Sequence, residues 1–145
     1  TTSTVYSVGT DNSVNGSGSK YVSYCWAEIP GYSKFGKYRG NYDANGTYIH
    51  LGFRPALIIV KKNTDDNWYM ADYKRDPTNP GDHRLFGDVN TVEGGTGQEH
   101  FDFLSNGFKW RRAKNPFNNN DTFFFYMAFA RRPGLTPYDT FPEAR

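Results

Sequence analysis

Apolar residues along this chain recur mostly at every second position, and short polar stretches divide them into brief runs. A period of two is that of a β-strand, because successive side chains of a strand point to opposite faces. The stretches between the runs are rich in Asn, Asp and Gly, which favour turns. We therefore predict strands at Thr4–Val8, Lys20–Glu28, Thr47–Leu51, Pro55–Lys62, Trp68–Tyr73, His100–Leu104, Phe108–Arg112 and Thr122–Ala130.

Two of these segments, Pro55–Lys62 and Thr122–Ala130, are apolar on both faces and should lie in the middle of a sheet. Lys20–Glu28 carries large side chains on one face and small ones on the other, as though another backbone approaches the small face. No segment shows a capped 3.6-residue stripe, and we expect at most one helical turn, at Pro77–Asp82. Short strands with regular turn signals predict an all-β fold, an antiparallel β-sandwich of the jelly-roll or lectin-like kind with little or no helix.

Composition supports this fold class. The 145 residues include 12 Phe, 11 Tyr and 3 Trp, but only 16 Leu, Ile and Val together. Aromatic and β-branched residues suit a pleated surface better than a helical bundle. The length fits one domain, predicted at 1–132, followed by an extended proline-rich tail at 133–145. Because it lacks an initiator methionine, we expect a processed product or a piece of a longer chain.

Charge and cysteine content exclude several classes. A net charge of +2 argues against a nucleic-acid partner bound by bulk charge. No apolar run approaches the roughly 18 residues of a membrane helix, so we expect no membrane insertion. The single cysteine, Cys25, excludes a disulfide framework within the chain and a thiolate zinc site.

The chain also contains a weak internal echo. With a shift of 103 residues, Val5–Val8 falls on Phe108–Arg111, and Tyr21 and Trp26 fall on two phenylalanines of the last predicted strand. Each copy reads as a short strand, an Asn/Gly-rich turn and a long aromatic strand. Either two β-arches arose separately, or the chain begins at the end of one repeat and contains most of the next.

The residues that could carry catalysis do not form a known motif. His50, His83 and His100 lack metal-ligand spacing, and the glycine-rich Gly94–Gly97 lacks the lysine and helix of a phosphate loop. We therefore expect a protein that is not an enzyme. A glycan depolymerase using paired aspartates remains the enzymatic alternative.

One short segment favours sugar binding. Asp65, Asp66 and Asn67 place oxygen ligands beside the rings of Trp68 and Tyr69. Aromatic faces can stack on sugar rings while the polar side chains bond to hydroxyls. The alternative is that Trp68 starts a strand and packs inward. Calcium could bind at Asp65 and Asp66 or at Asn118–Asp121, but neither place has a specific motif, so we expect no cofactor.

Other aromatic and apolar residues exceed what a domain of this size needs to bury. Those in the Gly31–Gly52 segment lie among lysines and an arginine, and they could equally form a hairpin that flanks the core. The apolar residues of the tail recur at every third position. As candidate contacts with a partner we take Tyr32, Tyr38, Tyr42, Trp110, Leu135, Tyr138 and Phe141.

Several phrases occur together in a recognisable order: Tyr21–Glu28, Gly31–Gly36, Gly52–Lys61, Asn67–Tyr69, Asp72 with Arg75, Asp102–Lys109 and Tyr126–Ala130. This series resembles a domain of virion proteins of tailed bacteriophages, many of them marine or cyanobacterial. Such domains are usually met in tail-fibre or other head- and tail-associated structural proteins, often as repeated units.

The resemblance implies a structural protein on the exterior of the phage particle, and it carries no catalytic residues. The expected partners are other virion proteins and further copies of the chain, with a trimer as one expected state. A host-surface glycan is an expectation by analogy with other exposed phage β-domains. A free carbohydrate-binding module remains an alternative to the virion role.

Overall fold

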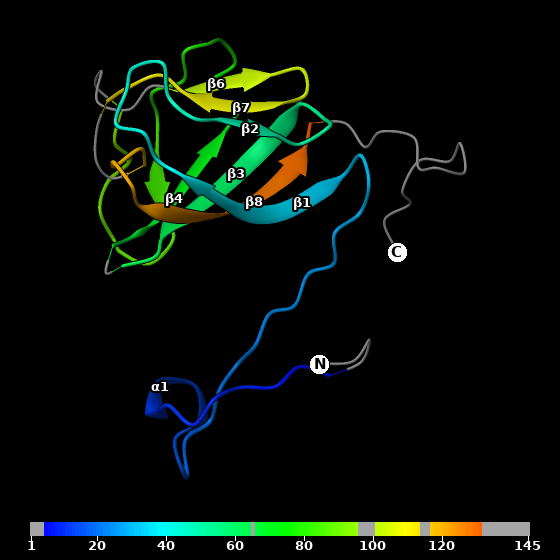
Figure 1. The fold of residues 1–145 in the computed structure, drawn as a ribbon, viewed down its shortest axis with the longest axis vertical. Coiled ribbons are helices and arrows are strands. Elements are labelled where there is room, and N and C mark those ends of the chain that lie inside the picture. Colours follow the sequence, from blue (N-terminus) through cyan, green and yellow to red (C-terminus); the bar gives the residue numbers. More distant parts are fainter. Residues whose placement is uncertain (1–4, 65, 96–100, 114–116, 132–145) are drawn as a thin grey trace.

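A computed structural model describes residues 5–64, 66–95, 101–113 and 117–131. Two antiparallel sheets pack face to face, as Figure 1 shows. The five-stranded sheet has the order β1-β8-β3-β4-β5, formed by β1 (Ser33–Arg39), β8 (Phe123–Ala130), β3 (Pro55–Lys62), β4 (Trp68–Asp72) and β5 (Leu85–Phe86). The three-stranded sheet has the order β2-β7-β6, formed by β2 (Tyr48–His50), β7 (Gly107–Trp110) and β6 (Phe101–Leu104). The predicted antiparallel sandwich is confirmed.

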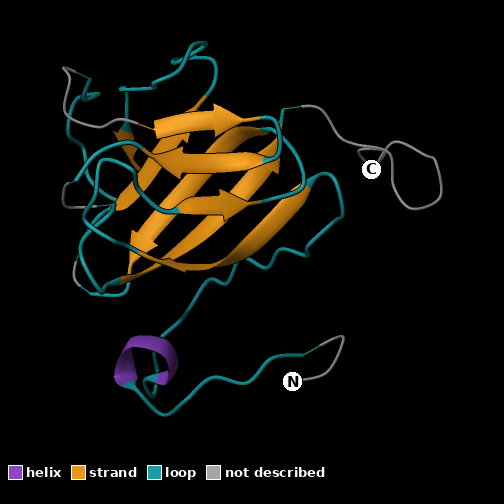
Figure 2. Ribbon diagram, turned by 45° about the horizontal axis from the view of Figure 1, so that its top comes forward, coloured by secondary structure: helices purple, strands orange, loops and turns teal. Residues whose placement is uncertain are grey.

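Helix is confined, among the described residues, to α1 (Asn12–Asn15), a single turn capped by Asp11. It falls within a stretch that the sequence indicated as a loop, whereas the turn expected at Pro77–Asp82 has no helix. Figure 2 shows α1 well separated from the sheets. The boundary predicted at residue 132 stays a prediction, because residues 132–145 lie outside the described part of the chain.

The two strands that are apolar on both faces lie at the centre of the larger sheet, as predicted. β8 pairs with β1 on one side and β3 on the other. On the inner face, Phe124, Tyr126 and Ala128 of β8 meet the three-stranded sheet and are buried. The alternate residues Phe123 and Phe125 lie on the outer face and are exposed. This outer face is therefore apolar although it borders solvent.

Two predicted strands are wrong. Residues of Thr4–Val8 within the described part and all of Lys20–Glu28 form no strand, and their side chains are exposed. No backbone hydrogen bond joins residues 20–28 to the described strands. The two halves of the internal echo thus differ, since the later copy forms β7 and β8. An alternation with a period of two indicates an extended backbone. Such a segment forms a β-strand only where another strand is available to pair with it.

Two strands were missed. β1 carries three cations and a glycine, a pattern that suits an edge strand better than a buried one. Its inner face nonetheless contributes Tyr38 to the core. Opposite Tyr126, Gly36 leaves the space in which that ring lies, because a Cβ on Gly36 would come within 2.8 Å of the Tyr126 hydroxyl. The second missed strand, β5, is only two residues long.

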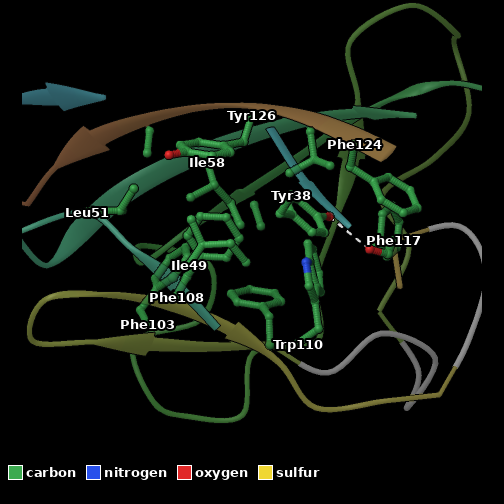
Figure 3. Close-up of a cluster of buried hydrophobic side chains, with 14 of the residues drawn as sticks. Tyr38, Ile49, Leu51, Ile58, Phe103, Phe108, Trp110, Phe117, Phe124 and Tyr126 are labelled. Carbon is green, nitrogen blue, oxygen red and sulfur yellow. Dashed lines mark hydrogen bonds between the residues drawn. The ribbon is translucent and has the colours of Figure 1, made fainter. Parts of the chain in front are cut away.

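Aromatic side chains fill the space between the sheets (Figure 3). The Tyr38 ring stacks on Phe124 with centroids 5.1 Å apart, and Trp110 stacks on Phe117 at 5.1 Å. The Tyr38 hydroxyl donates a 2.8 Å hydrogen bond to the Phe117 carbonyl, which joins the core to the loop before β8. Among the described residues, the core buries 10 aromatic side chains, and 9 others are exposed. The aromatic excess in the composition is therefore only partly explained by the core.

Candidate ligand-binding groove

The segment expected to bind sugar lies at the start of β4. The backbone N–H of Trp68 donates to Asp88 Oδ1 at 3.0 Å, and the Trp68 carbonyl accepts from Gly87 at 2.9 Å. Trp68 lies on the outer face of the five-stranded sheet and is 40% exposed. The prediction that this indole is accessible agrees with the structure, and the alternative that it packs inward does not.

Tyr69 requires a correction. It follows Trp68 in the same strand, so its side chain points to the opposite face and is 0% exposed. Its ring lies 3.8 Å from that of Phe117, and its burial raises the pKa of the phenol well above the usual range. A side chain enclosed in this way stabilises the core and has no face to offer a sugar.

The polar residues before Trp68 are less well placed than expected. Asp66 and Asn67 are half-buried, and Asp66 Oδ1 accepts the backbone N–H of Asn67 at 2.9 Å. Asp65 lies outside the described residues. Asp66 therefore shapes the turn into β4.

The predicted partner contacts divide into three groups. Tyr38 and Trp110 are buried in the core, which corrects the expectation that they lie at the surface. Their strands place them on the inner faces, and burial raises the pKa of Tyr38 well above its usual value. Tyr32 is half-buried with its ring edge-on to Phe129, whereas Tyr42 is exposed. The tail residues Leu135, Tyr138 and Phe141 lie outside the described residues.

The outer face of the five-stranded sheet forms one side of a groove of about 510 Å³, here called the aromatic groove. Its other side is formed by two residues that precede β1, Tyr24 and Trp26. These two rings lie 6.1 Å apart with their planes inclined by 30°. The described lining consists of Tyr24, Trp26, Ile59, Trp68, Met70, Gly87, Asp88 and Met127.

The groove is apolar, with one carboxylate among its described lining residues, Asp88. That carboxylate is held in place by the Trp68 backbone, and an ionised carboxylate has further acceptor sites to offer. Aromatic walls with a fixed acceptor suit a ligand that has an apolar face and hydroxyl donors. Among the described lining residues, no base lies beside a nucleophilic side chain.

Of the described groove residues only Trp68 was predicted as a site residue. The two other rings, Tyr24 and Trp26, and the carboxylate of Asp88 were not. The alternation of Lys20–Glu28 revealed that Tyr24 and Trp26 share a face, but it predicted a paired strand in which that face would be covered. Asp88 follows a two-residue strand and had no distinguishing motif. Contact between these residues and Trp68 depends on the tertiary fold.

The structure offers no cluster suited to a metal ion. Within residues 5–64, 66–95, 101–113 and 117–131, no three His, Cys, Asp or Glu side chains are placed to hold one. At Asn118–Asp121, one of the two places where calcium was considered, Asn118 is buried with its amide bonded to three backbone groups, and Asp121 pairs with Arg39. These contacts give both side chains a structural role.

A second polar pair, Asp72 with Arg75, lies at the end of β4. Arg75 Nη2 lies 3.0 Å from Asp72 Oδ2, and Asp72 Oδ1 accepts the backbone N–H groups of Lys74 and Arg75. Both side chains are partly buried at the end of β4. The pair therefore fixes the turn that follows this strand.

No helix in the described part of the chain has the length and apolar character needed to cross a bilayer. No curated protein and no solved structure matches the chain. Residues 1–133 match the family model described as "Domain of unknown function (DUF7483)", and the chain therefore belongs to that family.

Proposed function

We propose that this chain is a non-enzymatic structural and adhesion domain on the exterior of a tailed-phage particle, which binds a host-surface glycan in the aromatic groove. The observation that carries the proposal is the exposure of three rings around one groove: Tyr24 at 75%, Trp26 at 56% and Trp68 at 40%. Exposed aromatic clusters of this kind are rare on a surface without a ligand or partner.

The chemistry of the groove fits a saccharide. The C–H faces of a sugar are apolar and can stack on Tyr24, Trp26 and Trp68, while its hydroxyls donate to Asp88. Other virion proteins and further copies of the chain are the proposed partners, on the strength of the resemblance set out above. Neither nucleic acid nor membrane insertion is part of the proposal.

The two alternatives use the same groove differently. A free carbohydrate-binding module would bind the same sugars without a particle. A depolymerase would need two carboxyl groups flanking the scissile bond, either about 5–5.5 Å or about 6.5–9.5 Å apart. The described lining has a single carboxylate, Asp88, which favours binding without cleavage.

Binding to an array of bacterial surface polysaccharides tests the proposal. We expect Trp68→Ala and Trp26→Ala each to weaken binding at least about tenfold, as the loss of a central aromatic contact does. Trp68→Phe should recover part of the loss. The matched control is Tyr48→Ala, an exposed aromatic of the three-stranded sheet.

Two outcomes would count against the proposal. Unchanged binding by both tryptophan variants would remove the groove from the site. Release of reducing ends from a bound polysaccharide, with catalysis lost in Asp88→Asn, would replace adhesion by cleavage.

A further inference from the structure

Residues 5–28, here called the N-terminal arm, leave the sandwich at the start of β1 and run away from both sheets, with α1 at the far end (Figures 1 and 2). The tip is organised by its own contacts. The Tyr21 hydroxyl accepts the Gly16 N–H at 2.7 Å and donates to the Asn12 carbonyl at 2.6 Å. Asp11 caps α1. The tip of the arm therefore has a conformation held by its own hydrogen bonds.

The part of the arm between its tip and the sandwich has the properties of a strand without a partner. Val22, Tyr24 and Trp26 alternate with smaller residues, and all three are exposed. This part makes no backbone-to-backbone hydrogen bond to the described strands, and the Ala27 carbonyl accepts from Ser33 Oγ of β1 at 3.1 Å. Unpaired extended backbone with exposed apolar side chains is a template for pairing with another chain.

The outer face of the five-stranded sheet also exposes apolar side chains. Phe123 and Phe125 of β8 and Trp68 of β4 are exposed there, and half-buried Met127 and Ile59 lie in the rows between them. An antiparallel sheet with one face in the core normally presents polar side chains on the other. Here the second face exposes rings instead, with Lys37 and Arg39 of β1 lying beside Phe123. An arm and a face that both expose apolar side chains therefore occur on the same chain.

We propose that the arm of one copy of this chain lies on the outer face of the five-stranded sheet of a second copy, and that the exchange is reciprocal. The proposal deepens the proposed function, on which it rests for the identification of the partner as another subunit. In the assembly Tyr24 and Trp26 of one copy would lie over Trp68 and Asp88 of the other, in place of the groove that these four residues line within one chain. The exchange and glycan binding would therefore use the same rings.

The area available supports a second copy as the occupant. An aromatic side chain buries roughly 150–250 Å². Tyr24, Trp26, Trp68, Phe123 and Phe125 are together about half exposed, so covering their exposed parts removes on the order of 500 Å² from each chain. A reciprocal pair then buries about 1,000 Å² through these rings alone, which is the lower limit for a specific interface.

One further feature favours exchange over docking within one chain. Tyr24 and Trp26 touch their own sheet at the groove but keep most of their surface exposed. The turn between the arm and β1 is closed by hydrogen bonds between Ile29 and Ser33, with Gly31 at a φ of +73°, so the arm leaves the sandwich in a fixed direction. The arm lies within the domain that the family model matches, residues 1–133.

Cross-linking between two different variants tests the exchange. Both carry Cys25→Ser, which removes the exposed natural thiol. One carries Tyr24→Cys on the arm and the other Asp88→Cys on the sheet. After mixing and treatment with a short bismaleimide, we expect a covalent heterodimer of twice the chain mass. With Ser105→Cys, in the turn between β6 and β7, replacing Asp88→Cys, the yield should fall at least about fivefold, as for a site outside the interface.

The outcomes separate this inference from the proposed function. A heterodimer yield no higher than the Ser105→Cys control, with a monomer mass by light scattering, overturns the exchange. Efficient cross-linking within one chain that carries both Tyr24→Cys and Asp88→Cys, without heterodimer, also overturns it. Glycan binding by such a monomer leaves the adhesion proposal standing, whereas heterodimers without glycan binding leave only the exchange.

Discussion

Asn118 joins three segments of the chain, and its replacement by alanine gives a sharp test of the packing described above. The side chain is 1% exposed. Its Oδ1 accepts the Asn41 N–H at 3.0 Å, and its Nδ2 donates to the carbonyls of Asp43 at 2.9 Å and Arg112 at 3.1 Å. One amide therefore holds the loop after β1, the end of β7 and the turn before β8 together.

The expected loss follows from the backbone groups that Asn118→Ala leaves without this partner. A buried donor or acceptor left unsatisfied costs about 1–3 kcal/mol. Asn41 and Asp43 lie in an exposed loop, so water can replace part of what is lost. We expect the free energy of unfolding to fall by about 2–4 kcal/mol, a large part of the 5–15 kcal/mol typical of a domain. The melting temperature should fall by roughly 6–15 °C.

Urea unfolding followed by tryptophan fluorescence measures this change, because Trp110 packs against Phe117 beside the substituted position. Asn118→Asp is the conservative variant. It keeps the acceptor for Asn41 but loses both donors, so it should be destabilised as well. The matched control is Asn120→Ala, an exposed asparagine two residues along the same turn.

A change below about 0.5 kcal/mol in Asn118→Ala, within the range of ordinary surface substitutions, would refute the reasoning. It would mean that the three loops do not depend on this amide for their positions. Equal losses in Asn118→Ala and Asn120→Ala would also refute it, because the effect would then belong to the turn as a whole.

Three further predictions concern the Tyr38 hydroxyl, the close approach of Gly107 to β2, and the pair of His83 with Asp76. Tyr38→Phe removes only the hydroxyl that donates to the Phe117 carbonyl, and it should lower the free energy of unfolding by about 1–2 kcal/mol in the same urea assay. Gly107→Ala would place a Cβ against a carbonyl oxygen of β2, so a fall of more than about 2 kcal/mol, and a poor yield of folded protein, are expected. The hydrogen bond to Asp76 raises the pKa of His83, so its stabilising effect is complete below the unfolded pKa of about 6.5 and is lost as the pH rises through the raised folded pKa. The stability difference between wild type and His83→Gln should therefore be largest near pH ~5.5 and disappear at alkaline pH, and an increase with pH would contradict this sign.

The fold class could be predicted from the sequence because the central strands carry a signal on both faces. β3 and β8 are apolar at consecutive positions. Such a run is expected of a strand that pairs with a neighbouring strand on each side and packs under a second layer. Their positions in the order β1-β8-β3-β4-β5 agree with that prediction. Edge strands carry a weaker signal, and for this reason β1, with its three cations, was not recognised.

The candidate site was predictable only at one residue. Trp68 and Tyr69 are adjacent aromatics in a strand, and the sequence indicates that they face opposite ways but not which of them faces the core. The register of β4 against β3 decides it, since Tyr69 pairs with Val60 and Ala71 with Ile58 on the inner face. A shift of one residue would exchange the roles of the two rings.

The wrong strand prediction at Lys20–Glu28 and the exchange proposed for the arm depend on the same residues. Its alternation is that of a paired strand, and nothing in it is wrong for one: the side chains of Val22, Tyr24 and Trp26 form an apolar row and the other face is small. Within one chain the partner edge is missing, and all three side chains are exposed. The strand prediction at these residues is therefore wrong. What the alternation did indicate is a row of apolar side chains on one side of an extended backbone, and the exchange proposed above would cover that row with the sheet face of another molecule.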